Sequence, residues 1–358
     1  MSNLTNSEQL IAACTVNLPL KFSAVAVNVH SNDQQLLNEL AEYYKSYSSN
    51  QPTEECIELY AIVSPIVEID ADWHNVERET GKSGLKESYF DTAEGRWIWK
   101  HKTGMKMLQR VERPIVIGPC RENIAQVINF INNQFLNHYQ RKGYMLGHAA
   151  AFSENGQVTA IAASSGGGKS TLMLQFLEKS QNKFLTNDRI MFKRDGSLVS
   201  AIGLSKMPRV NPGTLLNSAR LNHLLSDAFK AELNAMPIEE LWELEHKFDV
   251  QIEDEYGPDR VALKGDLTRL ILLDWELNSK EPTRLVPVNL ESDPSHIAGL
   301  QKRRGPFYHD ADGHFPFPDS CDSQSKYVDQ LTGVQVYRVV GAVNFQAAVD
   351  AYYELLGS

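Results

Sequence analysis

Residues 158–188 constrain this chain more than any other stretch of its sequence. An apolar run over residues 158–163 leads into a loop with three consecutive glycines, and an apolar-striped helix is predicted from Lys169. Because glycine adopts backbone conformations closed to other residues, such a loop can turn several N–H groups toward one anion. The positive end of the following helix points to the same place. The pattern therefore predicts a strand–loop–helix unit that binds an anion within an α/β fold.

The loop matches the phosphate-binding pattern G-x-x-x-x-G-K-[ST], with Ala163 in place of the first glycine. We expect Lys169 to reach the β and γ phosphates of a nucleotide and the Ser170 hydroxyl to ligate Mg²⁺. A glycine-rich turn without a ligand is the alternative, and the flanking strand and helix favour binding. The hydroxyl of Thr171 is expected near the same phosphates. The predicted nucleotide-binding residues are Ser164, Ser165, Gly166, Gly167, Gly168, Lys169, Ser170 and Thr171.

The next apolar run ends in an acid beside the loop. The sequence KFLTND, residues 183–188, places Asp188 at a predicted strand end. A carboxylate at that position can make a second contact to Mg²⁺. The other interpretation of Asp188 is a turn residue or cap before the following hairpin. No guanine-reading or transporter-type signature follows the loop, which argues against a GTPase and a transporter ATPase.

Local patterns predict the elements around this unit. Two buried strands, 144–152 and 158–164, are expected to pair across a turn. Hairpin turns are expected at Thr103-Gly104 and at Asp195-Gly196. Helical spacing of apolar residues predicts an amphipathic helix within residues 121–143, a closing helix over 344–356, and a helix that begins after Ser31 or Asn32 as its N-cap.

Length and composition set the remaining bounds. The 358 residues allow two or three domains. Near residue 140 an amphipathic helical pattern gives way to apolar strand-like runs, which predicts an N-terminal α/β domain over 1–140 and a second domain over 141–358. The net charge of −10 argues against a broad nucleic-acid surface. No apolar run is long enough to span a membrane, and no signal peptide is apparent. Four cysteines far apart fit a reducing cytoplasm, so we expect a cytoplasmic protein.

The short helix followed at once by an acidic strand end resembles the HPr kinase/phosphorylase superfamily. The matching residues are His148 in LGHAAAF, the loop ASSGGGKST, and Asn187-Asp188 in LTNDR. The stretches SKMPRVNPGT and LWELEHKFDV look most like the branch called HprK-related kinase B. The resemblance covers residues 140–275 best and is less specific outside them.

This resemblance implies a P-loop phosphotransferase core of the HPr kinase/phosphoenolpyruvate carboxykinase-like type, beside an N-terminal α/β domain. It implies ATP and Mg²⁺ as cofactors and a phosphoacceptor that is a protein, a peptide or a small molecule. It also implies partner proteins, such as an ATP-grasp-like protein, and a homo-oligomer. No nucleic acid and no membrane are expected as partners.

One departure from the family concerns proton transfer. The family carries an aspartate pair, and its first aspartate takes the proton from the attacking hydroxyl; Asn187 stands at that position here. An amide cannot act as a base, although it can orient a hydroxyl. Three interpretations stay open: Asp188 is both metal ligand and base, His148 takes the proton, or little base help is needed. We expect His148 and Asp188 to share the work, with Lys169 as the third catalytic residue. The alternative for His148 is a structural histidine in a core strand.

Further contacts to substrate or phosphate are predicted from two loops. The stretch SKMPRVNPG offers Lys206, Arg209 and Asn211, and a plain loop is the equal alternative. The stretch RRGPF offers Arg303 and Arg304 as a lid that grips phosphate or an acidic partner. The stretch WELEHK offers Glu243 and Glu245, for which an exposed helix face is the preferred interpretation.

The function predicted from these residues is an ATP-dependent kinase. It would transfer the γ-phosphoryl group to a hydroxyl, serine being the expected kind, of a protein, peptide or small metabolite in a Mg²⁺-dependent reaction. The alternative is a catalytically weak nucleotide-binding switch or scaffold that acts with partner proteins, which Asn187 keeps open. A carboxykinase-like metabolic transferase ranks last.

Overall fold

The structure is a computed structural model of the chain. It describes residues 7–22, 24–47, 52–77, 84–164, 166–244 and 246–357. The chain divides into two compact units. Unit 1 comprises Met1–Gly143 and Arg303–Cys321, and unit 2 comprises Tyr144–Lys302 and Asp322–Ser358. The sequence-based division placed residues 303–321 in the second domain, whereas in the structure this segment belongs to unit 1. Both units combine a sheet with helices, so the mixed α/β class is confirmed.

Unit 1 is built on an eight-stranded sheet with the order β1-β2-β3-β8-β7-β6-β5-β4. Strands β2, β3 and β8 are parallel neighbours, and β5, β6 and β7 form antiparallel hairpins. The bounds are β1 Val16–Phe22, β2 Val25–Ser31, β3 Glu55–Val63, β4 His74–Asn75, β5 Glu87–Thr92, β6 Gly95–Lys100, β7 Lys106–Gln109 and β8 Ile115–Gly118.

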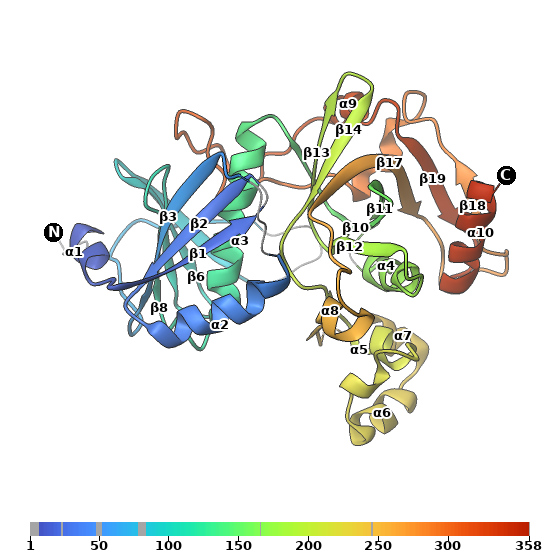
Figure 1. Cartoon of the computed structure of the whole chain (residues 1–358), viewed down its shortest axis with the longest axis horizontal. Coiled ribbons are helices and arrows are strands. Elements are labelled where there is room, and N and C mark those ends of the chain that lie inside the picture. Colours follow the sequence, from blue (N-terminus) through green and yellow to red (C-terminus); the bar gives the residue numbers. More distant parts are fainter. Residues whose placement is uncertain are drawn as a thin grey trace. The chain divides into compact units, whose positions relative to one another are not determined.

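Two amphipathic helices cover strands β1 to β3 of this sheet (Figure 1). Helix α2, Gln34–Tyr44, buries Leu36, Leu37 and Leu40, while α3, Ile124–Arg141, buries a longer apolar stripe. The N-cap of α2 is Asp33, whose Oδ1 accepts a hydrogen bond from the backbone N–H of Leu36 at 2.8 Å. The predicted cap, Ser31 or Asn32, was therefore wrong by one or two positions. A short helix α1, Ser7–Ala12, and a 3₁₀ turn, Lys45–Tyr47, complete this part.

Unit 2 contains a nine-stranded sheet whose main path is β12-β10-β11-β17-β14-β13-β9, with β19 beside β17 and β18 beside β19. Its strands are β9 Met145–Gly147, β10 Ala149–Glu154, β11 Gln157–Ala162, β12 Asn182–Thr186, β13 Ile190–Asp195, β14 Leu198–Gly203, β17 Lys264–Leu273, β18 Arg284–Pro287 and β19 Gln335–Val340. A separate pair joins β15, Arg209–Val210, to β16, Phe248–Asp249.

Alternation along β10 places different helices on the two faces of this sheet. Phe152 stacks on Phe176 of α4, Lys169–Leu177, and also contacts Tyr352 of α10, Phe345–Gly357. The neighbouring Ala149 and Ala151 belong to a buried cluster that includes residues of the 3₁₀ segment Pro294–Gly299 and of α9, Gln324–Gln330. The remaining helices are α5 Pro212–Leu216, α6 Asp227–Asn234, α7 Ile238–Glu243 and α8 Ile252–Tyr256, with a 3₁₀ turn at Asn222–Leu224.

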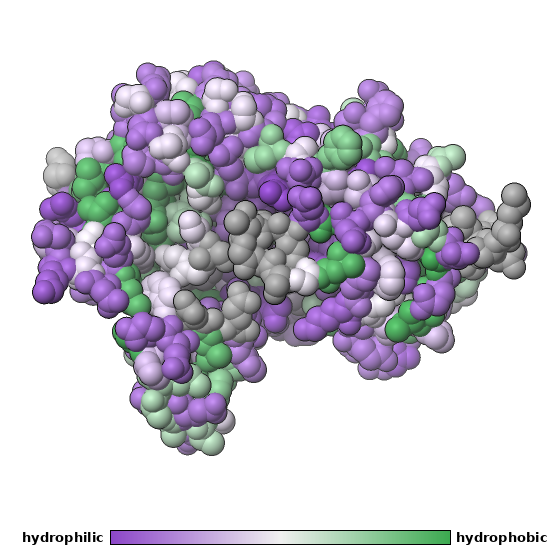
Figure 2. All heavy atoms as spheres, turned by 180° about the vertical axis from the view of Figure 1, so that it is seen from behind, coloured by the Kyte–Doolittle hydropathy of each residue, from purple (hydrophilic) through white to green (hydrophobic). Residues whose placement is uncertain are grey.

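Hydrophilic residues predominate on the face of the molecule shown in Figure 2. Among the helices that the structure describes, none has both the length and the apolar character needed to cross a bilayer.

Candidate functional site

The glycine loop follows β11 directly and ends where α4 begins. Gly168 is the N-cap of α4 and has a φ of 89°, and Gly166 has a φ of 79°. Only glycine adopts such positive φ values at little cost, so the loop geometry depends on these residues. The N–H of Gly167 donates to the carbonyl of Ser164 at 3.1 Å, and the indole N–H of Trp275 donates to the carbonyl of Gly167 at 3.2 Å. Ser165 lies outside the described residues.

Strand register brings three distant segments to one edge of the sheet. Strands β11 and β12 both run antiparallel to β10, so they end at the edge where β10 begins. Ala149 pairs with Ala162, and Ala151 pairs with Thr186. His148, the glycine loop and Asn187-Asp188 therefore gather at this edge, in front of the N-terminus of α4.

His148 lies between two strands, β9 and β10, where the sequence predicted a single strand. The expected strand over 144–152 is broken here into β9, which pairs with β13, and β10, which pairs with β11 and β12. The backbone N–H of His148 instead donates to the carbonyl of Leu300 at 2.7 Å. This break directs the imidazole to the sheet edge, so that His148 lies at a strand end.

Lys169 is buried in the first turn of α4, with 8% of its surface exposed. Its ammonium donates to the carbonyls of Ala163 and Ser164, at 3.0 and 3.2 Å. Burial lowers the pKa of Lys169 to about 8, and the charges of Lys302 and Lys247 act in the same direction while Asp188 opposes them. A buried ammonium held by backbone carbonyls can exchange them for an anion.

The side chains of His148 and Asp188 approach each other across this edge. The distance from His148 Nε2 to Asp188 Oδ1 is 3.4 Å, and Arg189 Nε lies 3.5 Å from the other carboxylate oxygen. Burial lowers the pKa of His148, against the opposing effect of Asp188. Burial works to raise the pKa of Asp188, but the hydrogen bond from His148 and the charges of Arg189 and Lys206 hold it well below the usual range. At neutral pH the carboxyl is ionised and the imidazole is neutral.

A cavity of about 210 Å³ opens beside Asp188. Asn187 lines this cavity, and its Oδ1 is buried without a hydrogen-bond partner among the described residues. Arg209 lines it as well and pairs through Nε with Asp249 Oδ1 at 2.9 Å. The lining residues are Thr186, Asn187, Asp188, Leu204, Lys206, Met207, Arg209 and Lys247. The structure thus brings Asn187, Lys206 and Arg209 of the predicted contacts to one cavity.

The remaining predicted residues of unit 2 lie nearby in the chain but differ in their contacts. Ser164 is exposed and Ser170 is half-buried in the first turn of α4. The hydroxyl of Thr171 is hydrogen-bonded to that of Thr214 in α5, at 2.7 Å, a contact that no local pattern predicts. Asn211 is the N-cap residue of α5 without a capping bond from its side chain.

The last four predicted positions fall elsewhere or outside the described residues. Arg303 and Arg304 belong to unit 1, where the Arg304 guanidinium lies 4.5 Å from the centre of the Tyr308 ring. Glu243 is the last residue of α7, and Glu245 lies outside the described residues.

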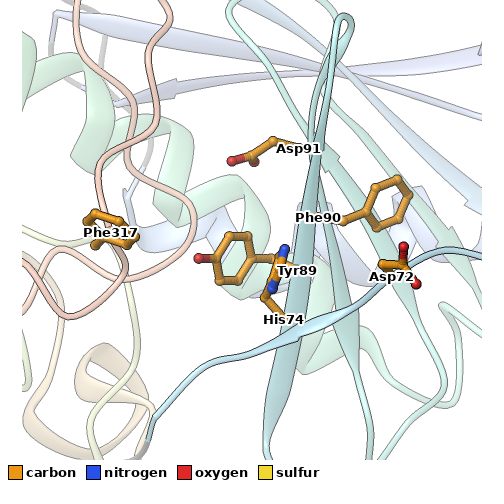
Figure 3. A pocket seen from close by; sticks show the side chains of 6 residues that line it. All are labelled: Asp72, His74, Tyr89, Phe90, Asp91 and Phe317. Atoms are coloured by element: carbon orange, nitrogen blue, oxygen red, sulfur yellow. The ribbon is translucent and has the colours of Figure 1, made fainter.

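Unit 1 contains a cavity that was not predicted from the sequence (Figure 3). Its volume is about 530 Å³, and it is lined by Asp72, His74, Tyr89, Phe90, Asp91 and Phe317. Figure 3 shows Tyr89 and Asp91 on one side of β5 and Phe90 on the other, as the alternation of a strand requires. Because the lining comes from three segments far apart in the chain, no local motif could have indicated it.

Comparison with known proteins adds little to this geometry. No protein-family model matches the chain, and no curated protein matches it. Among solved structures the chain is similar to the Hpr(Ser) kinase/phosphatase from Coxiella burnetii, with 10% sequence identity over 60% of this chain and 93% of that chain and a TM-score of 0.29. A similarity at this TM-score carries no conclusion about function.

Proposed function

We propose that unit 2 binds Mg-ATP at residues 163–171 and transfers its γ-phosphoryl group to a hydroxyl, as a kinase with the HPr kinase-like core that the sequence resembles. The observation that carries the proposal is the convergence of Lys169, His148 and Asp188 at one sheet edge, in front of the glycine loop and the N-terminus of α4. A phosphate group at this place meets an ammonium, backbone N–H groups and a helix dipole together.

The loop and its lysine fit a polyphosphate chemically. With a pKa of about 8, Lys169 is mainly charged at pH 7, and phosphate oxygens are stronger acceptors than the two carbonyls it now contacts. The Ser170 hydroxyl and the Asp188 carboxylate are oxygen ligands of the kind that Mg²⁺ prefers. When bound there, Mg²⁺ neutralises phosphate charge and orients the reacting groups.

Phosphoryl transfer then requires one bond exchange and one proton acceptor. The acceptor oxygen forms a bond to the γ-phosphorus, and the bond to the oxygen bridging the β and γ phosphates breaks with its electron pair left on ADP. The acceptor proton passes to His148, which is neutral because burial lowers its pKa. Its Nε2 faces Asp188, so the neutral ring keeps its lone pair on Nδ1. Asp188, with a strongly lowered pKa, is a weak base suited to metal binding and to orienting the imidazole.

The test is transfer of label from γ-labelled ATP, with Mg²⁺, into a cell extract divided into protein and small-molecule fractions. We expect wild-type protein to label one fraction and Lys169→Ala to lower this at least 100-fold, while Lys280→Ala, at an exposed position, changes nothing. Label that does not depend on Lys169, or no transfer into either fraction, would overturn the kinase proposal.

A nucleotide-binding switch is the second candidate, and one observation favours it. Asn187 supplies no base, and the lowered pKa of Asp188 makes its carboxylate a poor one, so transfer depends on His148 alone. Tight Mg-ATP binding without transfer, combined with ATP-dependent retention of a partner protein, is the result that would favour the switch over the kinase.

A further inference from the structure

We propose that the phosphoacceptor is a small hydroxy acid, bound through its anionic group in the cavity beside Asp188. This inference rests on the proposed function, because it assigns the acceptor side of the same site. The cavity is lined at Thr186–Asp188, where β12 ends, by residues 204–209 after β14, and by Lys247.

The charges that line the cavity select the ligand. Three cationic side chains, those of Lys206, Arg209 and Lys247, line it together with a single carboxylate, Asp188, and Asp249 outside the lining pairs with Arg209. The two oxygens of that carboxylate already contact His148 and Arg189. A cavity with this balance of charge attracts an anion and disfavours a cationic or neutral ligand.

Lys206 is the half-buried member of this set, whereas Arg209 and Lys247 are exposed. Burial lowers its pKa, and the charges of Arg189 and Arg209 act in the same direction, while Asp188 and Asp249 oppose them. A desolvated ammonium among other cations is stabilised when a carboxylate or phosphate enters beside it, because the interaction is weakly screened there. Lys247, which is exposed, can close over the ligand from the solvent side.

The other lining residues fit a hydroxyl-bearing carbon chain. Leu204 and Met207 offer apolar contact, whereas Asn187 carries a buried amide oxygen for which the described residues supply no donor. A hydroxyl is such a donor, and an amide in this position orients it without removing its proton. The carbonyl oxygen of Asn187 thus holds the acceptor hydroxyl next to Asp188 in the bound state, and the hydroxyl proton turns from it toward His148 for transfer.

The size of the cavity restricts what enters it. A volume of about 210 Å³ is below the range of pockets that hold drug-sized ligands. It admits a compact molecule of a few carbon atoms with one charged end. We therefore commit to a free small hydroxy acid as the occupant.

Calorimetry with glycerate and glycerol tests this inference, since the two probes share their hydroxyl groups and differ in the carboxylate. In the presence of Mg-ADP, we expect wild-type protein to bind glycerate at least tenfold more tightly than glycerol. Lys206→Met should weaken glycerate binding at least tenfold, and Lys206→Arg should keep it within about fivefold because the charge remains. Lys280→Met, at an exposed position outside the cavity lining, should change it less than twofold.

Three results would overturn the inference: equal binding of the two probes, glycerate binding indifferent to Lys206→Met, or displacement of glycerate by Mg-ADP. The last would assign the cavity to nucleotide phosphates. Mg-ATP titration of wild-type and Lys169→Ala protein on the same samples separates the two proposals. Failure of Mg-ATP binding removes the proposed function, whereas Mg-ATP binding without glycerate binding removes only the acceptor assignment.

Discussion

Three buried cations, Arg96 and Lys100 in unit 1 and Lys169 in unit 2, differ in their hydrogen-bond partners. In unit 1, Arg96 is 2% exposed and gives two hydrogen bonds, of 2.6 and 2.8 Å, to the two oxygens of Asp91. Lys100 donates to Glu87 at 2.7 Å, and both side chains are buried. In unit 2, the buried Lys169 instead donates to two backbone carbonyls. Arg96 and Lys100 of unit 1 thus each face a carboxylate, whereas Lys169 of unit 2 faces a loop.

Among these three side chains, the partner distinguishes two closed ion pairs from the one cation to which the proposed function assigns a ligand. Burial works to raise the pKa of Glu87, but the charges of Lys100 and Lys86 outweigh it, so the pair remains ionised and closed. Burial instead lowers the pKa of Lys169 to about 8, which indicates that its surroundings under-stabilise the ammonium. In the proposed function, an incoming phosphate would replace the two carbonyls as an anionic partner.

Asp188→Asn should have the largest effect on phosphate transfer. We expect phosphate transfer to fall by about 10³-fold, because a carboxylate that holds a catalytic metal contributes several kcal/mol to the transition state. The free energy of unfolding should fall by about 1–3 kcal/mol, because the ionised carboxylate is stabilised by His148 and Arg189 and asparagine keeps only the shape of the side chain. Solvent screening limits this loss, since the side chain is 47% exposed. Label transfer and denaturant unfolding measure the two effects. Unfolding without loss of transfer would reverse the roles that we assign to the two units.

Arg96→Met makes the complementary change in unit 1. Removing the guanidinium breaks its bonds to Asp91 and to the carbonyl of Pro316 and its packing over Tyr89, which we expect to destabilise the protein by about 2–4 kcal/mol. Chemical denaturation measures this. Arg121→Met, which breaks an ion pair with the arginine 45% exposed, is the control and should cost about 0–1 kcal/mol. Equal costs for the two variants would show that burial does not distinguish these pairs.

The pH dependence of transfer sharpens the comparison within unit 2. Because burial lowers the pKa of His148, the base should stay unprotonated until the pH falls below the usual range of histidine, and kcat/KM should then decline. Above a pH of about 8, Lys169 loses its charge and kcat/KM should fall about tenfold per pH unit. A pH–rate profile at subsaturating ATP measures both limbs. An acidic limb that persists in His148→Ala would exclude this histidine as the base.

Gly168→Ala tests the loop through its backbone. At a φ of 89° a Cβ costs about 1–2 kcal/mol, and it would lie 3.1 Å from the Phe345 ring. Gly196→Ala is a matched control, because this glycine has a φ of 61° in the β13–β14 turn with open space around it. Both variants should lose stability, but only Gly168→Ala should weaken Mg-ATP binding, as titration calorimetry would reveal. Comparable affinities for the two variants would count against the loop as the binding site.

Local patterns predicted the elements that local chemistry determines. The hairpin turns at Thr103-Gly104 and Asp195-Gly196 are present, with φ values of 72° at Gly104 and 61° at Gly196. The amphipathic and closing helices are confirmed as α3 and α10. Apolar periodicity and turn glycines act within a few residues, so the sequence shows them directly.

Features that depend on distant partners were not predicted. The break between β9 and β10 follows from pairing with separate strands and from the carbonyl of Leu300. The return of residues 303–321 to unit 1 depends on contacts such as Arg96 with Pro316, 220 positions apart. The sequence proposed His148, Lys169 and Asp188 as one site, and the structure brings them together, while their chemical roles remain proposals.

The most direct test of the central claim is the affinity for Mg-ATP of wild-type protein, Lys169→Ala and Lys280→Ala, measured by titration calorimetry at pH 7. If the glycine loop and its buried ammonium hold the phosphates, Lys169→Ala will bind at least tenfold more weakly than wild type, and Lys280→Ala will match wild type. Equal affinities of wild type and Lys169→Ala, or no binding by wild type, would contradict the account.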